Sequence, residues 1–352
     1  MRTQVCITID TEFSIGGAFA DANLRPVAGP MVYCDVDGQS QGLGFMLETF
    51  RATGVTATFF IEALHRYYFS DDPMRPIVRR IEQAGHELQL HIHPCWSVFQ
   101  HDDWAARVRD QPRQDNFADR PIDDSAALIR QGMANFSDWN LPAPTVFRSG
   151  SLEHDDNLYH ALAQSGVPYS SNVGLAIYDS GDPAYRLYAG RHLRHGVVEC
   201  PVLTFADWQL GSKQHLKTLT IAGTSFAETR LLLDQAQRAG VPLVVILTHP
   251  FEYVQSADLG RAAVRTHAVN QGRLQQLCRY VAANGERFVA TGLGAASVPA
   301  AGEVAGPDNP LLHGGLLRSV MRMATQVGYD RYGNWALARS SATHTRSKGN
   351  HA

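Results

Sequence analysis

The sequence offers few of the features that mark disulfide-stabilised or membrane-spanning proteins. Its five cysteines are far apart and form no CxxC pair, and an odd number of separated cysteines argues against a disulfide framework. No apolar run approaches the ~20 residues that a helix needs to cross a bilayer. The first residues also lack the charged stretch and apolar run of a signal peptide. We therefore expect a cytoplasmic protein in a reducing compartment, with no transmembrane segment.

An excess of basic charge and several common catalytic motifs are also missing. The net charge is −3 and the pI ≈ 6.6, whereas nucleic-acid binding typically requires a basic face. The chain contains no GxSxG nucleophile elbow, no GxxxxGK[ST] phosphate loop and no HExxH zinc helix. We expect no nucleic-acid partner; a small polar ligand or a neutral to mildly charged glycan fits this composition better. Nothing in the composition indicates an oligomeric state.

Short β-branched runs alternate with helix-like segments along most of the chain. The predicted strands are 4–9, 55–62, 86–93, 145–150, 167–173, 197–203, 241–250 and 287–291. The predicted helices are 42–53, 73–85, 123–139, 154–166, 226–240 and 261–284. This alternation is typical of an α/β fold with a mostly parallel sheet. About seven to eight such units favour a barrel over an open sheet.

The sequence changes character near its C-terminal end. We predict that residues 1–298 form the barrel domain and that residues 299–352 lie outside it. The segment that begins this second part is linker-like, and the last residues are polar and expected to be disordered. Between them, residues 311–327 have the pattern of one short amphipathic helix, which either packs on the barrel or mediates contacts.

Four of the predicted strands end in reactive side chains, at the edge where α/β barrels build their active sites. The first strand ends with Asp10 and Glu12, which share a face if the strand persists, although a turn with solvated acids has the same pattern. The strand at 86–93 ends with His91 and His93. Two imidazoles at this spacing project to one side of the strand and can bind one metal ion, although two structural histidines are the alternative.

Two other strand ends carry an arginine and a histidine. Arg148 leaves its strand into a glycine turn and could orient an acid of the site, although a surface salt bridge is the alternative. His249 follows a strongly apolar strand and is well placed as a general acid, because histidine titrates near neutrality; a satisfied core histidine is the alternative. Cys95 is either a metal ligand, a redox-sensitive neighbour or a small buried residue. Four such strand ends in one chain predict a single site.

Three neighbours of the histidines are candidates for supporting roles. Glu87 and Gln89 share the face of the two histidines and could hydrogen-bond to the imidazoles, although polar filling of the barrel interior is the alternative. Trp96 and the rest of loop 95–122 could line a glycan cleft, because aromatic faces stack on sugars. Anchoring of the loop is the alternative for these aromatic residues.

The ordered motifs TIDTE, GHELQLHIHP, FRSG and LTHP resemble those of the NodB-type polysaccharide deacetylases, carbohydrate esterase family 4. The similarity is greatest to the divergent members encoded in bacterial O-antigen and surface-polysaccharide gene clusters, which points to lipopolysaccharide biosynthesis. It covers about residues 3–292 and implies a distorted (β/α)7 barrel with a divalent metal, usually zinc. It also implies a deacetylase that hydrolyses an N-acyl group, expected to be N-acetyl, on a sugar or polysaccharide precursor.

The resemblance assigns a role to each reactive side chain. Asp10 matches the catalytic base, Arg148 the arginine that holds this base, and His249 the general acid. His91 matches the first histidine of the family's His-x-x-x-His motif. The second histidine of that motif would fall at Cys95, so His93 is the expected replacement.

The other displaced ligand leaves some alternatives open. Thr11 stands where most members have a metal-binding aspartate, so Glu12 is the expected substitute. Asp10 could instead bind the metal itself, with Glu12 or the geometry of the water taking over the role of the base. Two other functions also stay open: a catalytically silent barrel that binds a glycan, and a cyclic-amide hydrolase like the allantoinases, which share the barrel.

Overall fold

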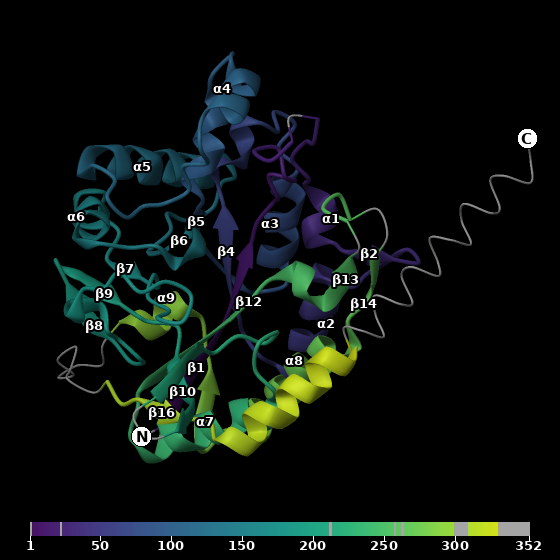
Figure 1. Ribbon diagram of the computed structural model, residues 1–352, viewed down its shortest axis with the longest axis vertical. Coiled ribbons are helices and arrows are strands. Elements are labelled where there is room, and N and C mark those ends of the chain that lie inside the picture. Colours follow the sequence, from purple (N-terminus) through teal and green to yellow (C-terminus); the bar gives the residue numbers. More distant parts are fainter. Residues whose placement is uncertain are drawn as a thin grey trace, which may run out of the picture.

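Seven parallel strands at the centre of the molecule curl into a barrel (Figure 1). In spatial order they are β12 (Leu243–Thr248), β1 (Thr3–Thr11), β4 (Thr58–Glu62), β5 (Glu87–Ile92), β6 (Val146–Ser149), β7 (Tyr169–Ser170) and β9 (Val197–Glu199). Val202, just after β9, closes the barrel through a parallel bridge to Val245 of β12. In the described part of the chain, isolated bridges rather than a regular ladder join this edge to β12. Seven parallel strands with an irregular closure are the predicted distorted (β/α)7 barrel, which is thus confirmed.

The computed structural model describes residues 2–21, 23–210, 213–256, 258–261, 264–298 and 309–329. Within these ranges the barrel strands are buried on both faces, which explains their nearly continuous apolar sequences. Every residue of β12 is buried, as are all residues of β1 except Gln4. One apolar cluster, which includes Cys6, Phe60 and Val245, fills the barrel interior. A larger cluster packs between the strands and the surrounding helices.

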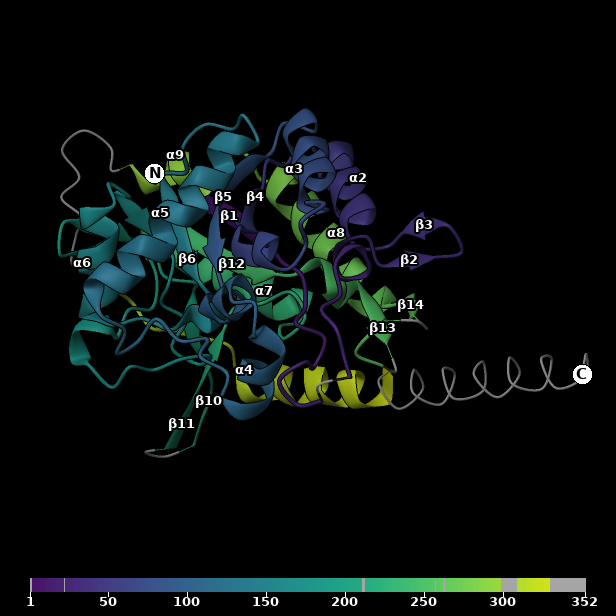
Figure 2. The same cartoon turned by 90° about the horizontal axis from the view of Figure 1, so that it is seen from above.

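The helices cover the outside of the barrel (Figure 2). The longer ones are α2 (Leu43–Thr53), α3 (Met74–Gln83), α5 (Ile122–Asp138), α6 (Asp156–Gln164), α7 (Phe226–Arg238) and α8 (Ala268–Ala283), and the short ones are α1 (Gly29–Val32), α4 (Trp104–Asp110) and α9 (Leu293–Ser297). Their ends follow ordinary capping rules. Gly54 ends α2 in the left-handed region with φ +67°, and Ser225 and Glu228 form a capping box at the start of α7.

Four of the barrel strands run directly or almost directly into a 3₁₀ turn at their carboxyl ends. These turns are η1 (Leu64–Tyr67) after β4, η2 (Pro94–Gln100) after β5, η3 (Gly150–Leu152) after β6 and η5 (Pro250–Tyr253) after β12. A fifth turn, η4 (Pro183–Tyr185), lies between β7 and β8. Because parallel strands share one carboxyl edge, the first four turns hold the functional side chains of neighbouring strands close together.

The remaining strands form small additions around the barrel. They are β8 (His192–Arg194) against β9, β15 (Phe288–Ala290) against β1, the hairpins β2 (Asp35–Val36) with β3 (Gln39–Ser40) and β13 (Val254–Ser256) with β14 (Val264–Thr266), and β10 (Thr204–Leu210) with β11 (Lys213–Thr218) and β16 (Leu312–His313). The predicted helix 261–284 is wrong in its first turn, because residues 264–266 pair with β13 and the helix begins at Ala268.

The C-terminal part of the described chain packs on the outside of the barrel. After β16 pairs with β10, residues 316–329 form a helix. The predicted linker and the predicted disordered tail fall mostly on residues 299–308 and 330–352, which lie outside the described residues. None of the helices in the described part of the chain combines the length and the apolar character that a membrane-spanning segment needs.

Candidate active site

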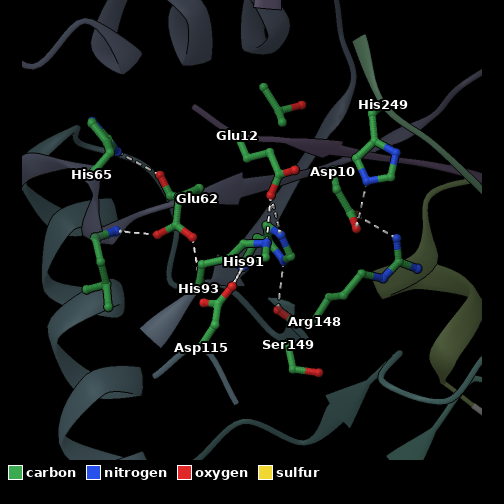
Figure 3. Close-up of polar contacts among 12 residues, drawn as sticks. Asp10, Glu12, Glu62, His65, His91, His93, Asp115, Arg148, Ser149 and His249 are labelled. Atoms are coloured by element: carbon green, nitrogen blue, oxygen red, sulfur yellow. Dashed lines mark hydrogen bonds and ion pairs between the residues drawn. The ribbon is translucent and has the colours of Figure 1, made fainter. Parts of the chain in front are cut away.

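The predicted site residues gather at the carboxyl edge of the barrel (Figure 3). Asp10 lies in β1 and Glu12 directly follows this strand; His91 lies in β5 and His93 caps η2. Arg148 lies in β6, and His249 caps η5 at the end of β12. The structure sorts these six side chains into two neighbouring groups, which are described in turn.

Glu12, His91 and His93 form the first group. One Glu12 carboxylate oxygen, Oε2, lies 3.3 Å from His91 Nε2 and 2.7 Å from His93 Nε2. The two imidazole rings stand edge to face with their centroids 5.0 Å apart. Burial alone would raise the pKa of Glu12, but the two imidazoles outweigh burial and hold this pKa well below its usual range.

Both imidazoles of this group use their other nitrogen for an outer hydrogen bond. His91 Nδ1 donates to the backbone carbonyl of Arg148 at 2.9 Å. His93 Nδ1 lies 2.8 Å from Oδ2 of Asp115, a carboxylate that also pairs with Arg113. These contacts direct both Nε2 atoms toward Glu12. An oriented imidazole with its second nitrogen bonded to a carbonyl or carboxylate is the arrangement found around metal-binding histidines.

The position of His93 is fixed from two other sides. A Cβ atom on Gly150 would lie 2.4 Å from His93 Nδ1, so the glycine of the FRSG motif is needed for this close approach. On the other side, the His93 backbone N–H donates to the buried Glu62 carboxylate at 2.5 Å. Burial raises the pKa of Glu62 to about 7, against the lowering effect of the two histidines and of the backbone donors.

Asp10 and Arg148 form the core of the second group. The Arg148 guanidinium is fully buried and donates to Asp10 Oδ1 at 2.7 Å. It also donates to the Thr8 hydroxyl at 2.9 Å and to the hydroxyl and backbone oxygens of Ser171 at 2.8 and 3.1 Å. Its guanidinium carbon lies 4.1 Å from the centroid of the Phe60 ring. With so many partners, Arg148 holds the Asp10 carboxylate in one orientation.

His249 completes the second group. Its Nε2 lies 3.9 Å from Asp10 Oδ2, the carboxylate oxygen on the side away from Arg148. Its Nδ1 lies 3.1 Å from Glu252 Oε1. The ring stacks on Phe251 with the centroids 4.8 Å apart. Burial lowers the pKa of His249, but the hydrogen bond and charge of Glu252, together with Asp10 and Glu12, outweigh this effect and raise the pKa to about 9. His249 is therefore protonated at neutral pH.

The first group fits a divalent metal ion by the chemistry of its donors. One donor atom from each of Glu12, His91 and His93 lies within 4.8 Å of the others. Two imidazole nitrogens and one carboxylate oxygen are a ligand set of catalytic zinc sites, which leave a further position for water. Asp10 is outside this group among the described residues, because its two oxygens face Arg148 and His249.

For Glu87 and Gln89 the structure favours polar filling of the barrel interior over hydrogen bonds to the imidazoles. Gln89 accepts hydrogen bonds from the backbone N–H groups of Thr145 and Val146 at 2.9 Å each, and it donates a hydrogen bond to Glu87 at 2.9 Å. Glu87 in turn accepts the Gly294 N–H at 2.8 Å, which ties β5 to α9. These two side chains face the barrel interior, but their hydrogen bonds join strands and α9 below the site rather than the imidazoles.

Cys95 and Trp96 lie beside the first group, in η2. Cys95 is buried, and its sulfur lies near His93 and Asp115 rather than within the Glu12 group. Trp96 is almost fully buried and packs against Phe99 with ring centroids 5.6 Å apart. It also lines a pocket of about 380 Å³, whose other lining residues include Glu12, His93, Phe13, Arg113 and Phe251. The pocket therefore opens beside the candidate metal ligands.

Three functional neighbours were missed by the sequence analysis. Asp115 lies in a loop without any periodic pattern, so no signal in its surroundings could have identified it. Glu62 is an acid at the end of a predicted strand, the same signal that identified Asp10. Glu252 follows His249 by three residues, a spacing that brings the two side chains together across one helical turn.

Similarity to known proteins is found among solved structures. No protein-family model matches the sequence, and no curated protein is significantly similar to it. A candidate polysaccharide deacetylase from Mycobacterium smegmatis is 16% identical, with 84% of this chain and 88% of that chain covered and a TM-score of 0.46.

A family 4 carbohydrate esterase from Streptomyces lividans, in complex with acetate, is 12% identical, with coverages of 82% and 91% and a TM-score of 0.37. A family 4 acetyl xylan esterase from Clostridium thermocellum, in complex with a cobalt ion, is 14% identical, with coverages of 84% and 90% and a TM-score of 0.38. These names belong to the family that the sequence motifs resemble. At such TM-scores, the interpretation of the site rests on the chain's own residues.

Proposed function

We propose that the protein is a divalent-metal-dependent hydrolase that removes an N-acyl group, most simply N-acetyl, from a sugar or polysaccharide precursor. The observation that carries this proposal is the division of the carboxyl edge into two groups. Three convergent donors (Glu12, His91 and His93) lie beside an oriented carboxylate and a protonated imidazole. Metal-assisted hydrolysis of an amide requires these components: a metal site, a base for water and an acid for the departing amine.

Each protein group has one step to perform. A divalent ion bound by Glu12, His91 and His93 would supply Lewis-acid chemistry, activating a water molecule and polarising the acyl carbonyl. Asp10 accepts the proton of the attacking water, since Arg148 holds its carboxylate in one orientation. His249, which carries a proton at neutral pH, donates this proton to the nitrogen of the leaving amine.

The donor set and the pocket support finer proposals about metal and substrate. Two imidazoles and a carboxylate suit zinc, so we propose zinc as the natural ion. The aromatic residues Phe13, Trp96 and Phe251 line the pocket beside the ligands and suit the apolar faces of a sugar ring. In a cytoplasmic setting the substrate would be a nucleotide-linked or lipid-linked precursor of a surface polysaccharide.

Two variants test the division of roles. His91→Ala is expected to lose the metal, because it removes one of three donors, whereas His249→Ala is expected to keep the metal and lose most of its turnover. The measurements are metal content by elemental mass spectrometry and acetate release from a panel of N-acetylated sugars. A metal-loaded His91→Ala protein would refute the ligand assignment. A metal-loaded wild-type protein that releases no acetate from any sugar would favour the silent glycan-binding barrel.

A further inference from the structure

The helix of residues 316–329 presents an apolar face to solvent. Its exposed large side chains keep between 48% and 73% of their surface accessible, and they are Leu316, Leu317, Val320, Met321, Met323 and Val327. At about 100° per residue these positions fall on one continuous arc of roughly 160°. An arc of this width is the apolar stripe that a surface helix normally turns toward a protein core, yet here it points outward.

The opposite face of the same helix is fixed to the barrel by polar contacts. Arg322 donates to Asp207 at 2.8 and 3.0 Å and to Glu228 at 2.9 Å, and both carboxylates are buried. Ser319 donates to Asp207 at 2.7 Å. At the far end, the Tyr329 hydroxyl accepts the Ala268 N–H at 3.0 Å. Anchored at both its beginning and its end, the helix cannot rotate its apolar arc inward without breaking a buried ion-pair network.

The charge of the surrounding sequence identifies what this arc would meet. Apart from Arg322, which is paired with Asp207 and Glu228, residues 309–352 contain five Lys or Arg side chains and one acidic side chain, although the whole chain has a net charge of −3. An apolar helix face next to a basic segment is the pattern of helices that lie in the plane of an anionic membrane surface. A second copy of the chain is the competing occupant of this face, and the test below detects it separately.

The position of the helix on the molecule is compatible with a flat partner. In Figure 2 the helix, drawn in yellow, runs along the same lower edge of the molecule as α4 and the β10–β11 hairpin. An edge of this kind can meet a bilayer without the barrel itself intervening. We propose that the helix of residues 316–329 docks this protein peripherally on an anionic lipid bilayer, with its apolar arc in the headgroup region and its ion-paired face on the barrel.

The test is sedimentation of the full chain with vesicles of phosphatidylcholine alone or mixed with phosphatidylglycerol. The test variant is Leu317→Glu/Met321→Glu, and the matched control is Ile177→Glu/Leu193→Glu, which changes two exposed apolar residues elsewhere, with 47% and 55% of their surface accessible. We expect the wild type and the control to bind the anionic vesicles and to be released by high salt. The test variant is expected to bind at least about tenfold more weakly, because two side chains can no longer enter the lipid.

Other outcomes overturn the proposal. Wild-type protein that stays in the supernatant with anionic vesicles contradicts it, as does an equal loss of binding in the two double variants. Light scattering after gel filtration detects the competing explanation. A wild-type dimer that becomes a monomer only in Leu317→Glu/Met321→Glu would show that a second copy covers this face. Val320→Gln/Val327→Gln, which adds no charge, repeats the test if the glutamate variant unfolds.

Discussion

Asp115 is predicted to govern metal affinity without touching the metal. Its carboxylate lies 2.8 Å from His93 Nδ1 and its side chain is only 15% exposed, so it fixes which nitrogen of His93 faces Glu12. A hydrogen bond to a charged group contributes about 1.5–3 kcal/mol. Loss of a partner of this kind typically weakens metal binding by about 10–100-fold. For Asp115→Asn, which keeps the shape and removes the charge, we expect a loss of about tenfold.

The assay is competition for zinc between the protein and a chromophoric chelator, which measures affinity without relying on turnover. The matched control is Asp103→Asn, which breaks an exposed pair with Arg107 at 2.7 Å on α4 and should leave zinc affinity unchanged. Asp115→Asn with wild-type affinity would refute the reasoning. An equal loss in the Asp103→Asn control would also refute it, because the effect would then come from the general charge of this region.

Two further predictions concern the other residues that hold the site. The hydrogen bond and charge of Glu252 are the largest of the effects that raise the pKa of His249 to about 9. Glu252→Gln removes the charge, so the alkaline limb of the pH–rate profile should move to lower pH. An unmoved limb would exclude His249 as the acid. Because this folded-state pKa is above the ordinary 6.5, the His249–Glu252 pair stabilises the fold fully below about pH 6.5, and this contribution is lost as the pH rises through 9. Urea unfolding should therefore show a smaller loss of stability between pH 6 and pH 10 in Glu252→Gln than in the wild type. Gly150→Ala places a methyl group 2.4 Å from His93 Nδ1, so zinc affinity should fall by about tenfold or more. The control Gly272→Ala meets only Gln276 at 3.7 Å and should bind zinc as the wild type does, and equal affinities in the two variants would contradict the role of Gly150.

The barrel could be predicted because its strands carry strong local patterns. Buried parallel strands such as β1 and β12 appear in the sequence as short runs of β-branched residues. Glycines such as Gly54 and Gly240 indicate the ends of helices. The start of α8 was placed too early because residues 264–266 have no local feature that reveals their pairing with β13. The β10–β11 hairpin was missed; among the described residues its strands pair with each other and with β16, outside the barrel.

The site was predictable where its residues sit at strand ends. Periodicity places His91 and Gln89 on the same face of β5, but it does not identify their hydrogen-bond partners. It therefore left open whether Gln89 contacts an imidazole or fills the barrel interior, as the structure has it. Long-range partners such as Asp115 are fixed by the folding of a loop, and no periodic pattern encodes them. Asp207 anchors the helix of residues 316–329, a contact between segments far apart in the sequence that no local pattern indicates.

The central claim is that Glu12, His91 and His93 form one metal site. The measurement that tests it most directly is the metal content of the purified protein after reconstitution with zinc, by elemental mass spectrometry, beside a His91→Ala/His93→Ala double variant. We predict about one zinc ion per chain in the wild type and none in the double variant, because two of three donors are removed. No metal in either protein, or equal metal in both, would contradict the account.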